Sequence, residues 1–250
     1  MASILAIHAH PDDIETLAAG TLALLTSLGH GVTIVTATAG ECGSTDADAA
    51  ATARIRREEA AAAAALIGAE YRCAGLADLA VFNDDAARRT ITEAVRWARP
   101  DVVITASPSD YHPDHEAVAA LVRDACFAAS APNYRTGPSA ALDGIPHLYF
   151  MDPIGGRGRD GSRVAADFGV DVAATFEIKR QMLERHISQM RWVSRQHGVG
   201  DHVASMEAWT RRRGADFGAS LAEGFRQYRG HPYPRGPLLQ EMVEAALRTV

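Results

Sequence analysis

The chain has 250 residues, of which 47% are hydrophobic and 22% charged, so it is long enough for one α/β domain or for a domain with an appended lobe. Its formal net charge of -6 argues against a nucleic-acid partner, which favours a basic surface. Three cysteines without CxxC spacing indicate free thiols. Neither a signal peptide nor an apolar run of ~20 residues is recognisable in the sequence. We therefore expect a cytoplasmic protein without a membrane span.

Strand-like and helix-like segments alternate in the first half of the chain. Short apolar runs predict buried strands, and apolar residues at helical spacing predict the helices between them. The expected strands are 3–9, 32–37 and 101–106, the expected helices are 14–25, 51–67, 85–98 and 113–127, and residues 38–50 are expected to form a polar loop. This alternation is typical of βαβ units with a parallel sheet. In such sheets ligands bind beyond the carboxyl ends of the strands, so the loops after Ala9 and Ala106 should share one edge.

The second half of the chain is more irregular. Its expected elements are a loop over 131–145, a strand over 147–151, a Gly-rich connection over 153–161, amphipathic helices over 177–193 and 202–228, and a short helix at the end of the tail. Four aromatic residues of the late helices are expected to pack in the core or at a subunit interface rather than against a sugar: Trp192, Trp209, Phe217 and Phe225.

Two short clusters of histidine and aspartate follow two of the expected strands: an HPDD motif at 10–13 and an HPDH motif at 112–115. Imidazole nitrogen and carboxylate oxygen are ligands of zinc, and a catalytic zinc site has three protein ligands and one open position. Because residues i and i+3 of a first helical turn face the same side, His10 and Asp13 can bind one ion, with His115 as the third ligand. A lone HPDD could equally be a helix N-terminus capped by aspartate, but two such clusters at matching strand ends favour a metal site.

With these motifs the sequence resembles the LmbE-like, or PIG-L, family of zinc-dependent de-N-acetylases, which carries AHPDD after its first strand and HPDH further along. Weaker similarities run along most of the chain, at 38–41, 55–59, Lys179, 186–189 and 222–226. The resemblance implies an α/β fold, a Rossmann-like three-layer sandwich with a mostly parallel sheet and a variable C-terminal lobe. It implies a single domain over 1–250, in which residues 1–130 carry the zinc site and residues 131–250 form the variable lobe and the C-terminal helices.

The resemblance also implies roles for the residues of the two motifs. One catalytic Zn2+ would be bound by His10, Asp13 and His115. The general base would be Asp12 and the general acid His112, with Asp114 orienting His112 and favouring its protonated form. Asp12 is the alternative for delivering the proton to the leaving amine.

Four further residues are candidates for substrate binding, each with a structural alternative: Glu41, Arg56, Tyr111 and His186. The guanidinium of Arg56 could grip a hydroxyl or phosphate group, or pair with a neighbouring glutamate. His8 lies two residues before His10 in a strand, so it should point to the same side and pack near the site or in the core. His202 is expected at the surface, with the substrate entrance as the alternative.

These observations predict a hydrolase that removes the N-acetyl group from an N-acetylated amino-sugar conjugate of GlcNAc type and releases acetate and a primary amine. The alternative is an amidase that cleaves a larger acyl or thioether-bearing amide on the same zinc. A dinucleotide-binding protein and a serine hydrolase are unsupported, because the sequence has no GxGxxG after the first strand and no GxSxG. The expected partner is a small acetylated sugar or glycoconjugate, and the late helices could form a homo-oligomer.

Overall fold

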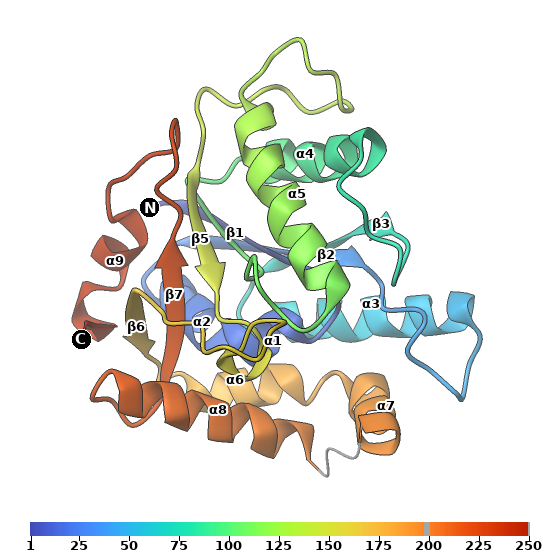
Figure 1. Ribbon diagram of the computed structural model, residues 1–250, viewed down its shortest axis with the longest axis vertical. Helices are drawn as coiled ribbons and strands as arrows, with labels where there is room; N and C mark the ends of the chain where they lie inside the picture. The colour runs from blue at the N-terminus through green and yellow to red at the C-terminus, as the bar shows by residue number, and fades with distance from the viewer. Residues whose placement is uncertain (198–200, 250) are drawn as a thin grey trace.

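One mixed β-sheet runs through the part of the chain that the structure, a computed structural model, describes: residues 1–197 and 201–249. Its strands are β1 (Ser3–His8), β2 (Gly31–Thr38), β3 (Glu70–Leu76), β4 (Val102–Thr105), β5 (His147–Met151), β6 (Phe168–Asp171), β7 (Ala222–Gln227) and β8 (Leu247–Arg248). The strand order is β3-β2-β1-β4-β5-β7-β6-β8 (Figure 1). The five strands from β3 to β5 are parallel, whereas β7, β6 and β8 join by antiparallel pairing. The strands from the second half of the chain therefore extend the sheet of the first half.

Helices cover both faces of this sheet and make a three-layer sandwich (Figure 1). They are α1 (Asp13–Leu17), α2 (Ala19–Ser27), α3 (Ala49–Ala65), α4 (Asp85–Ala98), α5 (Pro113–Ala129), α6 (Phe176–Leu183), α7 (Ile187–His197), α8 (His202–Asp216) and α9 (Leu238–Met242), with short 3-10 turns η1 (Ile154–Gly156) and η2 (Glu244–Ala246). None of the helices in the described ranges is both long and apolar enough to cross a membrane.

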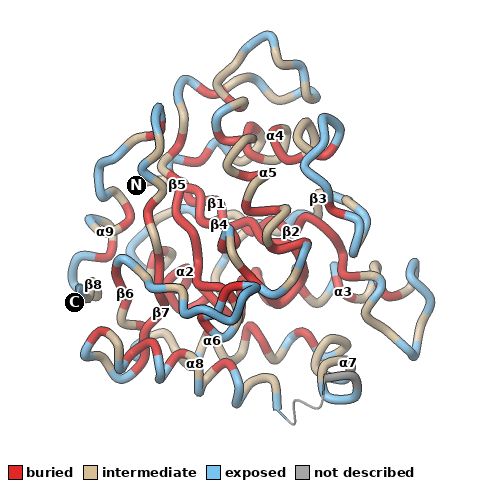
Figure 2. The backbone as a smooth tube through the Cα atoms, in the orientation of Figure 1, coloured by how far each residue is buried: buried red, intermediate tan, exposed pale blue. Residues whose placement is uncertain are grey.

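Each face of the sheet has its own hydrophobic core, because side chains alternate along a strand. Ile4 and Ala6 of β1 point to the core formed with α1, α2, α3 and α6, whereas Leu5 and Ile7 point to the core formed with α4 and α5. Figure 2 shows that the buried residues are concentrated along the central strands and that exposed residues follow the peripheral loops. The central strands are therefore rigidly packed on both sides up to their carboxyl ends.

The strands β1 and β4 are neighbours at the point where the direction of the chain through the sheet reverses. From β1 the chain continues to β2 and β3 on one side, and from β4 it continues to β5 on the other. The loops that leave such a pair diverge onto opposite faces, which opens a crevice between them. The loops that carry the two motifs, which are expected to share one edge of the sheet, meet at this crevice.

Several expected elements differ from the structure. The helix expected over 14–25 is divided at Ala18, whose φ of -142° is not helical, and the helix expected over 177–193 is divided between α6 and α7. The helix expected over 202–228 is wrong in its last part, since α8 ends at Asp216 and β7 follows. The residues of β7 favour a helix by composition, but pairing with β5 and β6 decides their conformation. The strands β3, β6 and β8 were not expected at all.

A buried ion pair joins the two halves of the chain. The Nζ atom of Lys179 donates to Glu223 Oε1 at 2.5 Å and to the backbone oxygen of Thr16 at 2.8 Å. The same Glu223 carboxylate accepts hydrogen bonds from the amides of Gly20 and Thr21. The only lysine of the chain therefore fastens α6 and β7 to the turn between α1 and α2, beside the site.

Candidate metal centre and active-site pocket

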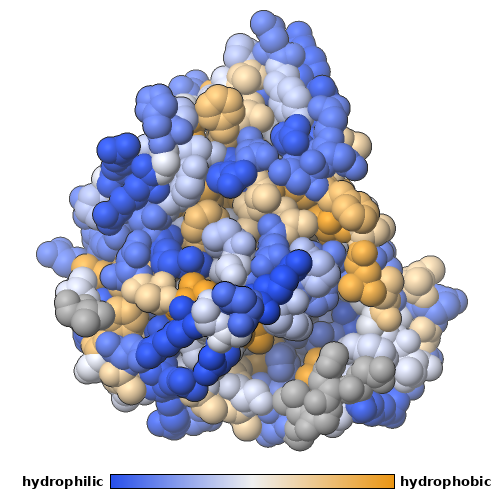
Figure 3. Space-filling view, viewed as in Figure 1, coloured by the Kyte–Doolittle hydropathy of each residue, from blue (hydrophilic) through white to orange (hydrophobic). Residues whose placement is uncertain are grey.

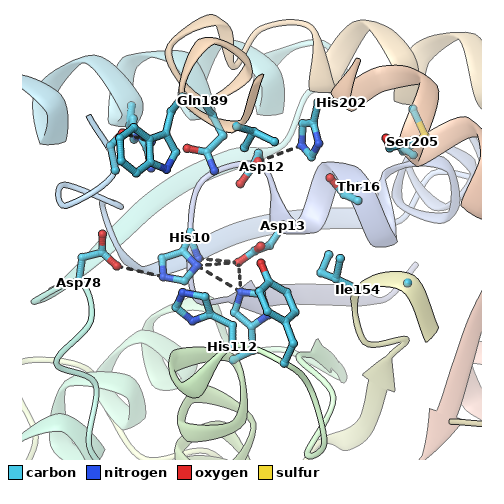
Figure 4. A pocket seen from close by; sticks show the side chains of 18 of the residues that line it. His10, Asp12, Asp13, Thr16, Asp78, His112, Ile154, Gln189, His202 and Ser205 are labelled. Atoms are coloured by element: carbon cyan, nitrogen blue, oxygen red, sulfur yellow. Dashed lines mark hydrogen bonds and ion pairs between the residues drawn. The ribbon is translucent and has the colours of Figure 1, made fainter. Parts of the chain in front are cut away.

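The two sequence motifs meet at the carboxyl ends of β1 and β4. The strands are in parallel register, with Ile7 opposite Thr105, so the segments that follow them leave the sheet side by side. Figure 4 shows His10, Asp13 and His112 close together at the centre of a pocket, as the sequence predicts.

The three expected metal ligands form a compact triangle of donor atoms. Asp13 Oδ2 lies 3.2 Å from His10 Nδ1 and 3.3 Å from His115 Nε2, and the two histidine nitrogens are 3.3 Å apart. Two ligands that each lie about 2.0–2.1 Å from one tetrahedral zinc ion are about 3.3 Å from each other. All three side chains are at least nine-tenths buried. The donor atoms therefore have the spacing of a zinc site.

Each histidine of this triangle has a carboxylate next to its other ring nitrogen. The other ring nitrogen of His10, Nε2, lies 3.1 Å from Asp78 Oδ1 and 3.4 Å from Asp114 Oδ2. His115 Nδ1 lies 3.2 Å from Asp110 Oδ2. Such partners fix the ring orientation of metal-binding histidines and increase their basicity. Among the described residues, three groupings of His and Asp could bind a metal: His10 with His112 and His115, His8 with Asp13 and His115, and His10 with Asp78 and Asp114. In the last of these the contacts are made by Nε2 of His10.

These carboxylates change the proton affinities of the metal-free site. Burial lowers the pKa of His10, but its hydrogen bonds with Asp114, Asp13 and Asp78 outweigh this effect and raise the pKa well above its usual value. Burial also lowers the pKa of His115, but the charge of Asp13 and the hydrogen bond that His115 donates to Asp110 raise it to about 9. Without a metal, both imidazoles are therefore protonated at neutral pH.

The carboxylate of Asp13 contacts the side chain of His8 and a backbone amide. His8 Nδ1 lies 2.7 Å from Asp13 Oδ2, and the amide of His10 donates to the same oxygen at 2.8 Å. Burial raises the pKa of Asp13, but the neighbouring His115 and His8 outweigh it and hold the pKa well below its usual range. His8 thus lies directly behind the site, and Asp13 is ionised.

Asp12 opens α1 in an unusual backbone conformation. Its φ of 98° and ψ of -20° belong to the left-handed region, which aspartate tolerates better than most residues but which still costs about 1–3 kcal/mol. The carboxylate lies in the pocket, 3.1 Å from His202 Nε2 (Figure 4). This turn lets Asp13 face the other ligands while Asp12 faces the open space of the pocket.

The expected pairing of Asp114 with His112 is not present. The Asp114 carboxylate accepts a hydrogen bond from the amide of Leu79 at 2.8 Å and lies against His10. His112 Nδ1 instead accepts from the backbone amide of Asp114 at 3.2 Å, so the neutral ring carries its hydrogen on Nε2. Burial, with the charges of His10 and His115, lowers the pKa of His112. The expected contact between the Asp114 carboxylate and His112 is therefore corrected to a hydrogen bond from the Asp114 backbone amide, and the protonation of His112 beside a bound metal stays a prediction.

Of the four expected substrate residues, the structure places two in the pocket and two outside it. Arg56 and Tyr111 line the pocket. Arg56 is buried, and its Nη2 donates to the backbone oxygen of Gly43 at 2.6 Å. Glu41 instead accepts from the backbone amide of Asp78, outside the pocket lining. His186 is fully buried, 3.1 Å from Glu15, so its direct contact with a substrate is corrected to a structural role.

Three residues near the site lie outside the two sequence motifs. Asp78 reaches His10 from the loop after β3, and His202 reaches Asp12 from the first turn of α8. Asp110 precedes the HPDH motif by two residues, and its Oδ2 also accepts a hydrogen bond from the amide of Ile154. Asp110 could have been inferred from the sequence, because it lies on the same loop as His112. His202, expected at the surface, instead lines the pocket, which was the alternative.

The pocket above the metal centre has a volume of about 600 Å³. Its lining comes from the two motif loops, the loops around Cys42 and Leu79, η1, and the facing sides of α7 and α8, which contribute Trp192 and Trp209. These two indoles therefore line the pocket and do not pack in the core, and their burial at a subunit interface stays a prediction, whereas Phe217 and Phe225 are buried as expected. In Figure 3 hydrophobic residues gather over the segment between β3 and α4, where Leu79 is 60% exposed. A largely apolar mouth thus leads to a polar, metal-binding floor.

The sandwich fold, the crevice between β1 and β4 and the His/Asp cluster define a class: α/β proteins with a metal site at the carboxyl edge of the sheet. The family model described as GlcNAc-PI de-N-acetylase, PIG-L, matches residues 5–126. The 1D-myo-inositol 2-acetamido-2-deoxy-alpha-D-glucopyranoside deacetylase of Nakamurella multipartita is 30% identical, over 94% of this chain and 92% of that one. This chain belongs to the PIG-L, LmbE-like family.

Other relatives share the fold or part of the sequence. The N,N'-diacetylchitobiose deacetylase of Pyrococcus horikoshii superposes with a TM-score of 0.76 at 24% identity, over 94% of this chain and 88% of that one. The 4-oxalmesaconate hydratase of Pseudomonas putida is 28% identical, but over only 60% of this chain and 61% of the hydratase. Relatives of this chain thus carry out more than one reaction, and the choice between them depends on the pocket.

Proposed function

We propose that this chain is a metal-dependent hydrolase that removes the N-acetyl group from an N-acetylated amino-sugar conjugate of GlcNAc type. The observation that carries the proposal is the triangle of donor atoms from His10, Asp13 and His115, with the Asp12 carboxylate in the same pocket. The deacetylase from Nakamurella multipartita, which aligns over nearly the whole chain, supports the choice of substrate.

Zinc fits this site, because two imidazole nitrogens and one carboxylate oxygen are a common donor set of catalytic zinc and leave one position open. His10, Asp13 and His115 would hold the ion. When bound, zinc supplies Lewis acidity, which polarises a carbonyl group and makes water more acidic. The carboxylates of Asp78 and Asp110 would keep the two imidazole rings in place.

The residues around this triangle would carry the protons. Asp12 accepts a proton from the water that adds to the amide carbon. His112, neutral and with its hydrogen on Nε2, donates a hydrogen bond to the oxyanion that develops on the former carbonyl oxygen. Asp12 then returns the proton to the amide nitrogen as the carbon–nitrogen bond breaks, and acetate and a primary amine are released. The lowered pKa of His112 favours Asp12 over His112 as the acid.

Two rival activities are less well supported. The amidase for larger acyl groups has no counterpart among the relatives described above. A hydratase for a polycarboxylate, suggested by the Pseudomonas putida relative, would need cationic side chains. Among the described residues that line the pocket, Arg56 is the only arginine or lysine, whereas Asp12, Asp13 and Asp78 contribute negative charge. This charge balance favours an uncharged amide substrate.

The direct test is acetate release from a panel of N-acetylated glucosamine glycosides by metal-free and zinc-restored protein. We expect release only after zinc is restored. The matched control is Asp13→Asn, which removes one ligand and should stay inactive in the presence of zinc. Equal release with and without zinc would contradict a metal-dependent reaction, and no release from any glycoside would contradict the deacetylase proposal.

A further inference from the structure

The pocket has two chemically different ends. In Figure 4 Asp78 lies at one side of the metal centre, and Ile154 and Ser205 lie at the other. The first end holds polar groups: Asp78 and the loop around Gly43 stand beside Arg56, and the indole nitrogen of Trp192 faces the same loop. The second end, between η1 and α8, is lined by Ile154, Met206 and Trp209. An amino sugar with its hydroxyl groups suits the first end, and an apolar group suits the second.

The pocket is also larger than the sugar alone. An N-acetylhexosamine has fifteen non-hydrogen atoms and, at roughly 20 Å³ for each in a close-packed site, occupies about 300 Å³. The pocket volume is about 600 Å³. Nearly half of the space therefore remains for another part of the substrate, and part of that space is the apolar end.

Trp209 is held in a fixed position at this end. A Cβ atom on Gly156 would overlap the six-membered ring of the indole, so only glycine lets the ring pack against η1. The Arg213 guanidinium carbon lies 4.9 Å from the ring centroid, and Asp152 fixes that guanidinium with hydrogen bonds of 2.7 and 2.8 Å. Because η1 and the Asp152–Arg213 pair order the indole before a ligand arrives, binding against it costs little conformational entropy.

We propose that the end of the pocket formed by Ile154, Met206 and Trp209 is a subsite for an uncharged aromatic aglycone of the amino sugar. This inference rests on the proposed deacetylase function and names its substrate class. An aromatic ring stacks favourably on a fixed indole, whereas a phosphate would lack a cationic partner at this end and a polyol would lose its hydrogen bonds to water there. A longer acyl chain on the nitrogen is the other group that could fill the space, and the experiment below separates the two.

The test compares kcat/KM of the zinc-loaded protein on the methyl and phenyl glycosides of N-acetylglucosamine, on N-acetylglucosamine 1-phosphate, and on methyl N-hexanoylglucosaminide. We expect the phenyl glycoside to exceed the methyl glycoside by about tenfold, through KM, from one stacked ring. Trp209→Ala should remove this advantage, so that the ratio of kcat/KM for the phenyl and methyl glycosides falls to about one, and Trp209→Phe should retain part of it. Trp97→Ala, which removes an indole that stacks on Arg72 outside the pocket, is the matched control.

The possible results of this test distinguish a failure of the proposed subsite from a failure of the proposed reaction. Equal kcat/KM for phenyl and methyl glycosides, or a preference for the phosphate or the hexanoyl amide, overturns the aromatic subsite and leaves amide hydrolysis in place. No turnover of any compound contradicts the deacetylase proposal instead. In that case calorimetry measures the affinity of the methyl and phenyl glycosides for wild type and Trp209→Ala without turnover. Tighter binding of the phenyl glycoside than of the methyl glycoside by wild type, but not by Trp209→Ala, supports the subsite. Equal affinity of wild type for the two glycosides overturns it.

Discussion

The Nε2 atom of His202 lies 3.1 Å from the Oδ2 atom of Asp12, so the first turn of α8 contacts the residue that opens α1. Burial lowers the pKa of His202, but its hydrogen bond with the Asp12 carboxylate outweighs this effect and raises the pKa above its usual value. A charged or neutral imidazole with hydrogen on Nε2 can donate to that carboxylate and hold it in one orientation. His202 is therefore a positioning residue for the proposed general base.

Replacing His202 with alanine should lower kcat about ten- to a hundredfold, the usual effect of removing a residue that orients a catalytic group. Zinc content should not change, because His202 contacts none of the three expected ligands. His202→Gln, which keeps a side-chain donor, should recover part of the activity. The control is His30→Ala, which removes a histidine that contacts the backbone at Ala2. An unchanged kcat in His202→Ala would show that Asp12 needs no such partner.

Asp12→Asn should retain zinc and lower kcat about 10²–10⁴-fold, because asparagine cannot accept the proton of the attacking water. The fold should tolerate the change, since asparagine adopts the left-handed conformation of this turn as readily as aspartate. Metal analysis and acetate release on the same samples measure both effects. Asp13→Asn is the informative comparison, because it should lose zinc as well as activity. Full activity of Asp12→Asn would exclude Asp12 as the base.

Zinc binding should release protons at neutral pH. His115 has a pKa of about 9 without metal and His10 a pKa well above its usual value, yet both must be neutral to bind the ion. The apparent affinity should therefore increase as the pH rises toward about 9, where His115 loses its proton. Calorimetric titration of the metal-free protein at pH 7, in two buffers with different ionisation enthalpies, measures the number of protons. Identical binding heats in both buffers would mean that the imidazoles are already neutral.

The part of the site that the sequence predicts is the part built from local geometry. His10 and Asp13 share one turn after a buried strand, and His115 lies one turn into the next motif helix, so spacing alone limits where their side chains point. The parallel sheet followed from the alternation of apolar strands and helices. The location in the cytoplasm and a homo-oligomer stay predictions.

The part that the sequence does not predict depends on packing between distant segments. Asp78 and His202 reach the site only because the loop after β3 and the start of α8 fold over it. The segment of β7, with Ala222, Glu223 and Gln227, has the composition of a helix, and only its place between β5 and β6 makes it a strand. Trp209 lies in a helix as expected, but its side chain was expected in the core or at a subunit interface, because helical periodicity does not distinguish a core from a pocket wall.

The buried pair of His186 and Glu15 should make stability depend on pH. His186 Nε2 lies 3.1 Å from Glu15 Oε1, and both side chains are almost completely buried. Burial lowers the pKa of His186, but the charge of Glu15 outweighs it, so the pKa in the folded state is above its usual value. A group with a raised folded-state pKa stabilises the fold fully below its unfolded pKa of about 6.5, and this contribution is lost as the pH rises through the folded value.

His186→Gln removes the titrating group and keeps a polar side chain of similar length. Breaking a buried ion pair of this kind costs about 3–5 kcal/mol, so the variant should lose about that free energy of unfolding at pH 6. The loss should become smaller at pH 9 as the pH rises toward and through the raised folded-state pKa of His186. Urea unfolding of wild type and variant at both pH values, followed by circular dichroism, measures the difference. His30→Gln serves as the control, because His30 has no carboxylate partner among the described residues. If the difference between wild type and His186→Gln were the same at pH 6 and pH 9, then His186 would stabilise the fold by packing and not by its charge.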